Sequence, residues 1–309
     1  MKFAIISDIH GNYPALVKVI EDANLNNVDR FIFIGDYIFD LPFSNDVVQC
    51  ISKLKNADVI LGNKETYLKG LYKDNQSDWV YNQMGALYQI YRELSAETID
   101  FISTLKEEAY IQLEFGNFIY ASHYTKGMPQ KAKQDCGSAS FHKKMIECPF
   151  SHEQFLDDFR ILINQDDYKK MFNEINAKII LFGHNHLQAY GYCEEKLIIN
   201  PGSCGQPLDS DNRAAYTILE ETRSGFNVIE KRVEYDIENT IQSAKKTKVY
   251  ECGTIWCELV FLAMRTGRDY FGIFFEIASE IASSKGEKGN FFTNETWQQA
   301  YNIFISTRL

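Results

Sequence analysis

The chain has 309 residues, 45% of them apolar and 24% charged, which is the composition of a globular protein with a sizeable core. Its formal net charge of −10 disfavours general binding to nucleic acid or to anionic membranes, because both need a basic face. The sequence predicts neither a membrane span nor a signal peptide. Seven cysteines without a CxxC pair favour reduced thiols, so we expect a cytoplasmic protein.

The first half of the chain alternates strand-like runs with amphipathic segments, which favours an α/β fold. A helix is predicted over residues 13–23, with Asn12 as its cap and Pro14 in its first turn. A second helix is expected to begin at Ser44. The segment 64–94 is helical in pattern and rich in tyrosine.

The middle of the chain changes its pattern twice. Residues 109–121 alternate with a period of two around Gly116-Asn117, which predicts a β-hairpin. Residues 124–150 have no strong periodicity, and we expect a long loop of the kind that often serves as a lid. Residues 178–234 return to a β pattern.

Two further signals concern helices and domain limits. Ser151 and Gln154 match a capping box that opens a helix. From residue 236 onward the apolar residues recur at helical spacing. The sequence therefore predicts a domain over residues 1–235 and a helical extension over 236–309 that serves packing or oligomerisation.

Five short polar fragments each follow a strand-like apolar run. Ligands of an open α/β sheet bind beyond the carboxyl ends of its strands, so we expect these fragments to converge in space. The fragments are Asp8-Ile9-His10, Gly35-Asp36, Gly62-Asn63, Ser122-His123 and Gly183-His184-Asn185-His186.

The donor atoms of these fragments suit a transition-metal centre. Residues i and i+2 of a strand point to the same side, so Asp8 and His10 are expected to project together, as are His184 and His186. Carboxylate, imidazole and amide donors suit Mn²⁺, Fe²⁺, Zn²⁺ or Ni²⁺. Seven donors exceed the three or four that a single catalytic zinc takes from protein, so we predict two ions sharing one carboxylate. Each fragment taken alone is more often a turn or a buried histidine, and only the joint pattern favours metal.

The order of the five fragments resembles that of the calcineurin-like metallophosphoesterase superfamily. The segment 200–207, followed by Asp211 and Arg213, resembles its compact prokaryotic phosphodiesterase branch. The resemblance covers about residues 1–235. It implies a four-layer αββα sandwich, with two mixed β-sheets face to face and helices outside, to which the C-terminal helices are added.

The resemblance also implies an activity and the residues that carry it. A phosphodiester or small nucleotide-type substrate would be hydrolysed by a hydroxide bridging two divalent ions, which lower the pKa of the water that supplies it. One ion would be held by Asp8, His10, Asp36 and His186. The other would be held by Asp36, Asn63, His123 and His184.

Lys64 is a departure from the family pattern, because many members have a histidine there. Lysine can stabilise a departing oxyanion, or donate a proton if its pKa is lowered, but it can equally be a surface residue. Asn12 can present N–H groups to phosphate or simply cap a helix. Arg213 can bind a second phosphate or a carboxylate, or it can pair with Asp209 or Asp211. We therefore predict catalytic roles for Asn63, Lys64 and Asn12, and substrate binding for Arg213.

Other functions stay open at this point. Within enzymes the alternative is a protein or phosphomonoester phosphatase; outside enzymes it is a non-catalytic interaction module on the same fold. A nuclease is less attractive, because no Lys/Arg-rich stripe is present. Aromatic residues of the extension can form a homo-oligomer surface. Tyrosines that can stack on a nucleobase, although core positions are more usual, are Tyr67, Tyr72, Tyr81, Tyr88 and Tyr91.

Overall fold

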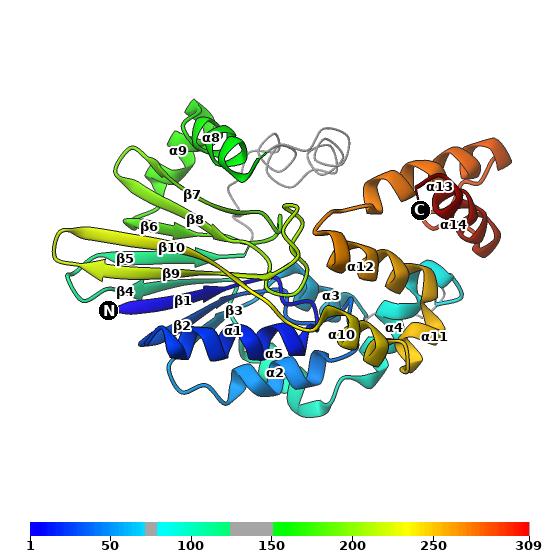
Figure 1. Ribbon diagram of the computed structural model, residues 1–309, viewed down its shortest axis with the longest axis horizontal. Helices are drawn as coiled ribbons and strands as arrows, with labels where there is room; N and C mark the ends of the chain where they lie inside the picture. The colour runs from blue at the N-terminus through cyan, green and yellow to red at the C-terminus, as the bar shows by residue number, and fades with distance from the viewer. Residues whose placement is uncertain (72–78, 124–150, 309) are drawn as a thin grey trace.

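The computed structural model describes residues 1–71, 79–123 and 151–308. Two mixed five-stranded sheets lie face to face, and helices cover the outer face of each (Figure 1). This arrangement confirms the predicted α/β sandwich with added C-terminal helices.

The first sheet has the strand order β10-β9-β1-β2-β3. β1 pairs in parallel with β2, with Phe3 opposite Arg30, and antiparallel with β9, with Phe3 opposite Leu219. The bounds are β1 Lys2–Ile6, β2 Arg30–Ile34, β3 Ala57–Ile60, β9 Ala214–Thr222 and β10 Gly225–Val233.

The second sheet has the order β4-β5-β6-β8-β7, and β6 pairs in parallel with both β5 and β8. Its strands are β4 Glu108–Gln112, β5 Phe118–Ser122, β6 Ile179–Leu181, β7 Gln188–Cys193 and β8 Lys196–Pro201. The predicted hairpin between β4 and β5 is confirmed. Leu113 N–H donates to Asn117 O at 2.8 Å, and Gly116 has φ +85°.

The side chains of β1 show why these strands are uninterrupted apolar runs. Phe3 and Ile5 point into the layer between the sheets, whereas Ala4 and Ile6 point into the layer beneath the helices. Both faces of the strand are therefore buried, so an alternation with polar residues is absent.

Helices follow the predicted start signals. Asn12 caps α1, because its side chain accepts from the N–H of Ala15 at 3.2 Å. Ser151 and Gln154 form the predicted capping box at the start of α8. Helices on the first sheet are α1 Tyr13–Leu25, α2 Ser44–Ser52 and α5 Ala96–Thr104, and those on the second are α8 His152–Ile163 and α9 Asp166–Glu174.

The predicted helical segment 64–94 is divided in the structure. It contains α3 Asn63–Leu71, the 3-10 helix η1 Asn82–Met84 and α4 Gly85–Glu93. The predicted long loop over residues 124–150 and Tyr72 lie outside the described residues.

The C-terminal segment is helical, as predicted. α12 buries Cys257 and Phe261 in the core of the first sheet, and α12 to α14 share a second apolar cluster around Phe274 and Trp297. The division of the chain at residue 235 into two domains stays a prediction. The helices are α10 Ile237–Ala244, α11 Lys248–Cys252, α12 Thr254–Thr266, α13 Phe271–Lys285 and α14 Asn294–Arg308.

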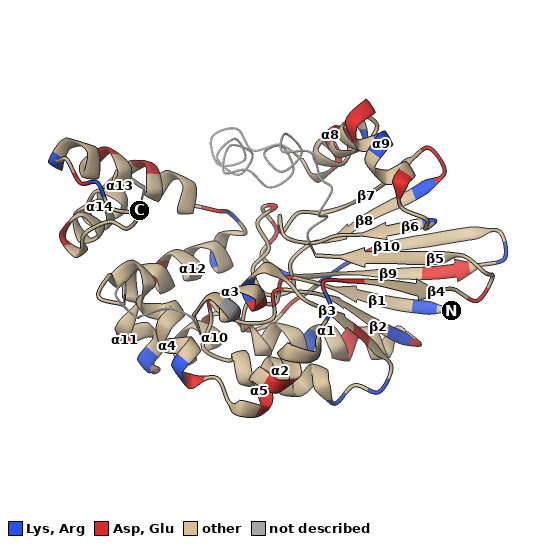
Figure 2. Ribbon diagram, turned by 180° about the vertical axis from the view of Figure 1, so that it is seen from behind, with Lys and Arg blue, Asp and Glu red and all other residues tan. Residues whose placement is uncertain are grey.

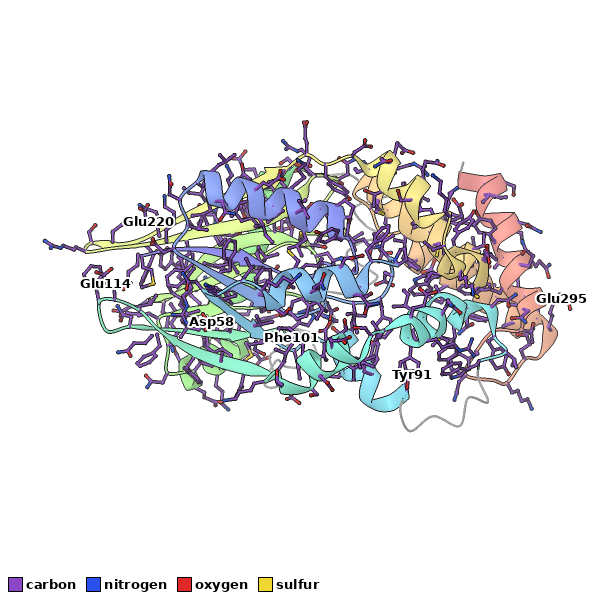
Figure 3. The ribbon with its side chains drawn as sticks, turned by 90° about the horizontal axis from the view of Figure 1, so that it is seen from below. Asp58, Tyr91, Phe101, Glu114, Glu220 and Glu295 are labelled. Carbon is purple, nitrogen blue, oxygen red and sulfur yellow. The ribbon has the colours of Figure 1, made fainter. Side chains whose placement is uncertain are left out.

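One edge of the two sheets and the C-terminal helices lie at opposite ends of the molecule. Figure 3 shows Glu114 and Glu220 at one end and Glu295 of α14 at the other. Among the described helices, none has the length and apolar character needed to cross a membrane.

Candidate metal centre

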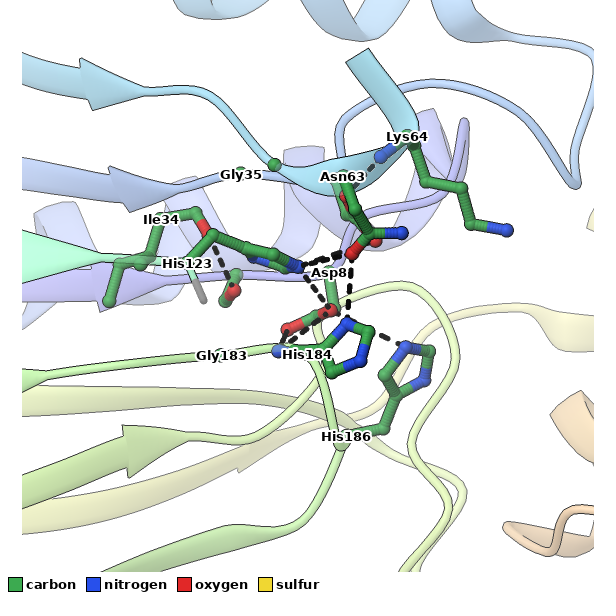
Figure 4. A network of polar contacts seen from close by, with 12 residues as sticks. Asp8, Ile34, Gly35, Asn63, Lys64, His123, Gly183, His184 and His186 are labelled. Carbon is green, nitrogen blue, oxygen red and sulfur yellow. Dashed lines mark hydrogen bonds and ion pairs between the residues drawn. The ribbon is translucent and has the colours of Figure 1, made fainter. Parts of the chain in front are cut away.

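The seven predicted ligands converge beyond the carboxyl ends of five strands. Figure 4 shows Asp8, Asn63, His123, His184 and His186 among them. Three of the seven ligands form a first group. His186 Nε2 lies 3.4 Å from Asp8 Oδ1 and 3.0 Å from His10 Nε2, and His10 Nε2 lies 3.8 Å from Asp8 Oδ1. The candidate ligand atoms of this group all lie within 4.8 Å of one another, a spacing that can hold one metal ion.

A second group lies beside the first. His123 Nε2 is 3.4 Å from Asp36 Oδ2, and His184 completes a set whose ligand atoms also lie within 4.8 Å of one another. Asn63 Oδ1 is 3.0 Å from His123 Nε2 and 2.9 Å from His184 Nδ1. The amide oxygen of Asn63 therefore adds a fourth donor to this group.

Asp36 lies between the two groups. Its Oδ2 is 3.4 Å from His123 Nε2 and 3.9 Å from His10 Nε2. Its Oδ1 accepts from the backbone N–H of Lys64 at 2.8 Å, which fixes the carboxylate. Asp36 is thus placed to serve both groups. Asp8, whose Oδ1 lies 3.9 Å from His123 Nε2, also faces the second group from the first.

The ligands converge beyond the strand ends as predicted, but strand alternation does not orient their side chains. His184 and His186, which alternation was expected to place together, belong to different groups. β1 ends at Ile6 and β6 at Leu181, so strand alternation does not act on the ligands that follow. Five of the seven have left-handed backbone, and a non-glycine residue in this region costs about 1–3 kcal/mol. Their φ values are 53° at Asp8, 51° at His10, 56° at Asp36, 76° at His184 and 61° at His186. The side chains are aimed by strained loops, and such strain clusters at functional sites.

Gly35 shows how closely these loops approach one another. A Cβ atom at Gly35 would lie 2.5 Å from Gly62 Cα and 2.9 Å from His123 Nδ1. Gly35 also has φ +85°. Only glycine allows the loops that carry Asp36, Asn63 and His123 to pack this closely.

Three of the histidines are oriented by partners on their outer nitrogen. The Nδ1 atom of His10 lies 2.7 Å from Asp40 Oδ2, that of His123 lies 2.5 Å from Ile34 O, and that of His186 lies 2.7 Å from Gln206 O. Each of these contacts turns Nε2 toward the centre, and such outer partners are typical of metal-binding imidazoles.

Glu65 is a buried residue that the sequence analysis did not assign to the site. Its carboxylate accepts four backbone N–H groups, those of Asp36, Tyr37 and Ile38 after β2 and that of Gly62 after β3, at 2.7 to 3.3 Å. Glu65 therefore ties together the two loops that carry Asp36 and Asn63.

The buried charges of the centre shift its pKa values. Burial acts to raise the pKa of Asp36, but the neighbouring His123 and His10 outweigh it and lower the pKa to about 2. Burial acts to lower the pKa of His123, but Asp36 and Asp8 outweigh it and raise the pKa to about 10. Burial lowers the pKa of His186 to about 3. The buried carboxylates thus stabilise positive charge beside them. A divalent cation would supply that charge once the imidazoles release their protons to become ligands.

The position of Lys64 argues against two of the three roles left open by the sequence, a surface position and proton donation. Its Nζ is 3.0 Å from Asp40 Oδ2 and its side chain is only 18% exposed, so it is not a solvated surface residue. Burial acts to lower the pKa of Lys64, but the charges of Asp40 and Asp36 outweigh it and raise the pKa above its usual value. The lowered pKa required for proton donation is therefore absent.

The hydrogen bonds of the Asn12 side chain give it a structural role. Its side chain is fully buried, and beside the cap contact its Nδ2 donates to Gly205 O at 2.8 Å and to Tyr235 Oη at 3.0 Å. These contacts confirm its role as a helix cap. They use both amide hydrogens, so the structure gives no support to the predicted catalytic role.

Arg213 is placed in an ion pair with Asp211. Its Nη2 and Nε donate to the two carboxylate oxygens at 2.6 and 3.0 Å, and Arg213 does not line the cavity at the ligands. This ion pair is one of the alternatives open from the sequence, and the substrate contact of Arg213 stays a prediction. We expect Arg213→Ala to change kcat/KM less than about twofold, because an exposed ion pair contributes little. A tenfold rise in KM would instead restore a role in substrate binding.

The comparisons with known proteins agree with this geometry. Residues 1–224 match the family model of the calcineurin-like phosphoesterase superfamily domain. An uncharacterised protein of Methanocaldococcus jannaschii is 25% identical over 265 residues, 80% of this chain and 93% of that protein.

Two crystal structures are similar in fold. A metallophosphoesterase from Sphaerobacter thermophilus is 22% identical with a TM-score of 0.60, covering 86% of this chain and 100% of that one. A hypothetical protein from Pyrococcus horikoshii is 15% identical with a TM-score of 0.62, covering 87% and 99%. Both crystal structures cover a larger part of this chain than the family model does, so the likeness in fold extends into the C-terminal helices. The chain belongs to the calcineurin-like phosphoesterase superfamily and is a metal-dependent phosphoester hydrolase.

Proposed function

We propose that this protein binds two divalent transition-metal ions, Mn, Fe, Zn or Ni, and hydrolyses a phosphodiester or a small nucleotide-type substrate. The observation that carries the proposal is the position of Asp36 between two groups of donors. Asp8, His10 and His186 would hold one ion together with Asp36. Asn63, His123 and His184 would hold the other together with Asp36.

The positions of the described residues support distinct roles for the metal ions, for Glu65 and Asp40, and for Lys64. Bound divalent ions would act as Lewis acids toward the phosphate and lower the pKa of a water nucleophile. Glu65 and Asp40 keep the ligands in place through the contacts described above. Lys64 lines the cavity at the ligands, where its ammonium group can bind an oxygen of the substrate or of the leaving group.

Charge distribution favours a small substrate over nucleic acid. Lys and Arg are interspersed with Asp and Glu over the described elements rather than gathered on one face (Figure 2). A protein that follows a nucleic-acid backbone needs a basic stripe. The cytoplasmic location and self-association through the C-terminal helices stay predictions.

Turnover of two aryl esters tests the proposal. We expect Mn²⁺-loaded protein to hydrolyse bis(4-nitrophenyl) phosphate at least about tenfold faster than 4-nitrophenyl phosphate, in kcat/KM, and EDTA to abolish both activities. A preference for the monoester would favour the phosphomonoester or protein phosphatase alternative. Absence of turnover with Mn²⁺, Fe²⁺, Zn²⁺ and Ni²⁺ would favour the non-catalytic interaction module. The complete set of metal donors argues against that alternative.

A further inference from the structure

A second cavity adjoins the one at the ligands. The ligand cavity has a volume of about 400 Å³ and the second of about 710 Å³. The residues that line both cavities are Asp40, Lys64, Tyr67 and Trp256. A group attached to a phosphate at the metal centre can therefore extend past Lys64 into the second cavity.

The walls of the second cavity differ from those of the ligand cavity. Beyond the shared residues, Leu71, Met84 and Leu87 supply apolar side chains, and Thr66 and Gln83 add polar groups. Its size lies within the range of pockets for small organic ligands, roughly 300–1,000 Å³. The end shared with the ligand cavity is lined by the ion pair of Lys64 and Asp40, and the rest of the second cavity is largely apolar. These walls suit an apolar group attached to a phosphate that is bound at the metal centre.

Trp256 is held rigidly at the boundary between the two cavities. Its Nε1–H donates to Asp40 Oδ1 at 3.0 Å, and its ring centroid is 4.6 Å from that of Phe271. Asp40 in turn contacts His10 and Lys64. Trp256 belongs to α12 and lies outside the residues matched by the family model. The C-terminal helices thus supply one wall of the substrate cavity.

We propose that the second cavity binds an aromatic ring on an ester arm of the substrate, a ring system of the size of a nucleobase or naphthalene. The inference rests on the proposed function and adds the class of substrate. Flat aromatic walls from Tyr67 and Trp256 favour stacking, and the thioether of Met84 makes favourable contacts with a ring.

Calorimetry with phosphonates on the full-length, Mn²⁺-loaded protein tests the inference without using catalysis. The probes are methylphosphonate, octylphosphonate and 1-naphthylphosphonate. We expect 1-naphthylphosphonate to bind at least about tenfold more tightly than methylphosphonate, and more tightly than octylphosphonate. A preference for the octyl chain would overturn the choice of an aromatic occupant.

Met84 offers the variant that locates the ring. Met84→Trp is expected to fill the cavity and reduce the preference for naphthyl over methyl at least about fivefold, with methylphosphonate affinity unchanged. Met84→Gln, which is nearly isosteric, makes the wall polar and is expected to reduce the preference if the larger side chain prevents folding. Leu25→Trp, at the exposed far end of α1, is the matched control and should leave the preference intact.

The outcomes separate the two proposals. If methylphosphonate binds but naphthyl gives no preference, or if a folded Met84 variant keeps the full preference, the inference is overturned and the proposed function stands. If none of the phosphonates binds and neither ester is hydrolysed, both proposals are overturned.

Discussion

Replacing Asp36 by asparagine is expected to lower kcat/KM at least about 10³-fold, which corresponds to roughly 4 kcal/mol of transition-state stabilisation. The asparagine side chain can keep the oxygen that accepts from Lys64 N–H, so the loop should stay in place. The group facing His10 and His123 becomes an amide NH₂, which cannot bind a cation. One substitution should therefore weaken metal binding at both groups of donors.

Metal content and activity together test this expectation. Calorimetric titration with Mn²⁺ should show weaker binding at both sites of Asp36→Asn, while circular dichroism stays as in the unchanged protein. Asp46→Asn, an exposed carboxylate in the first turn of α2, is the matched control and should keep full metal binding. Loss of only one ion would contradict the position of Asp36 as the shared ligand.

The sequence predicts the convergence of the seven donor residues because their signals are local. Most of the donors follow an apolar run that is buried on both faces, whereas β3 before Asn63 is only partly buried. Parallel strands place their carboxyl ends at one edge of a sheet. Combining seven donors from five such ends therefore identifies the site without knowledge of any distance. The same local logic located the cap at Asn12 and the capping box at Ser151.

The backbone at the ligands was not predictable in this way. Strand alternation paired Asp8 with His10 correctly but for the wrong reason, because both stand in left-handed loops beyond β1. It also paired His184 with His186, which belong to different groups of donors. The contacts that hold these loops depend on the tertiary structure. Trp256 lies 216 positions from Asp40 in the sequence, so no local pattern links them.

Arg213 and Lys64 show a related difficulty. A cationic side chain near a motif has several possible partners, and the chain around it does not indicate which of them is nearest. The structure places Arg213 on Asp211, whereas Lys64 is directed to Asp40 at the cavity. Both outcomes depend on how separate loops pack, and this is why residue type alone did not distinguish them.

Glu65→Gln is expected to lower the free energy of unfolding by about 2–4 kcal/mol, although the two side chains have nearly the same shape. Each carboxylate oxygen of Glu65 accepts two backbone N–H groups. A glutamine places its NH₂ against one pair of these donors in either orientation. That pair of buried donors then loses its acceptor.

Thermal unfolding in EDTA is the measurement, because bound metal would itself stabilise the folded state and mask the difference. Glu280→Gln, on the exposed surface of α13, removes the same charge and is expected to leave the unfolding midpoint nearly unchanged. The loops tied by Glu65 carry Asp36 and Asn63, so Mn²⁺ affinity should also fall, by about 10–100-fold. An unchanged midpoint for Glu65→Gln would mean that a neutral side chain serves equally well, and the charged acceptor would then have no role in holding the two metal-binding loops together.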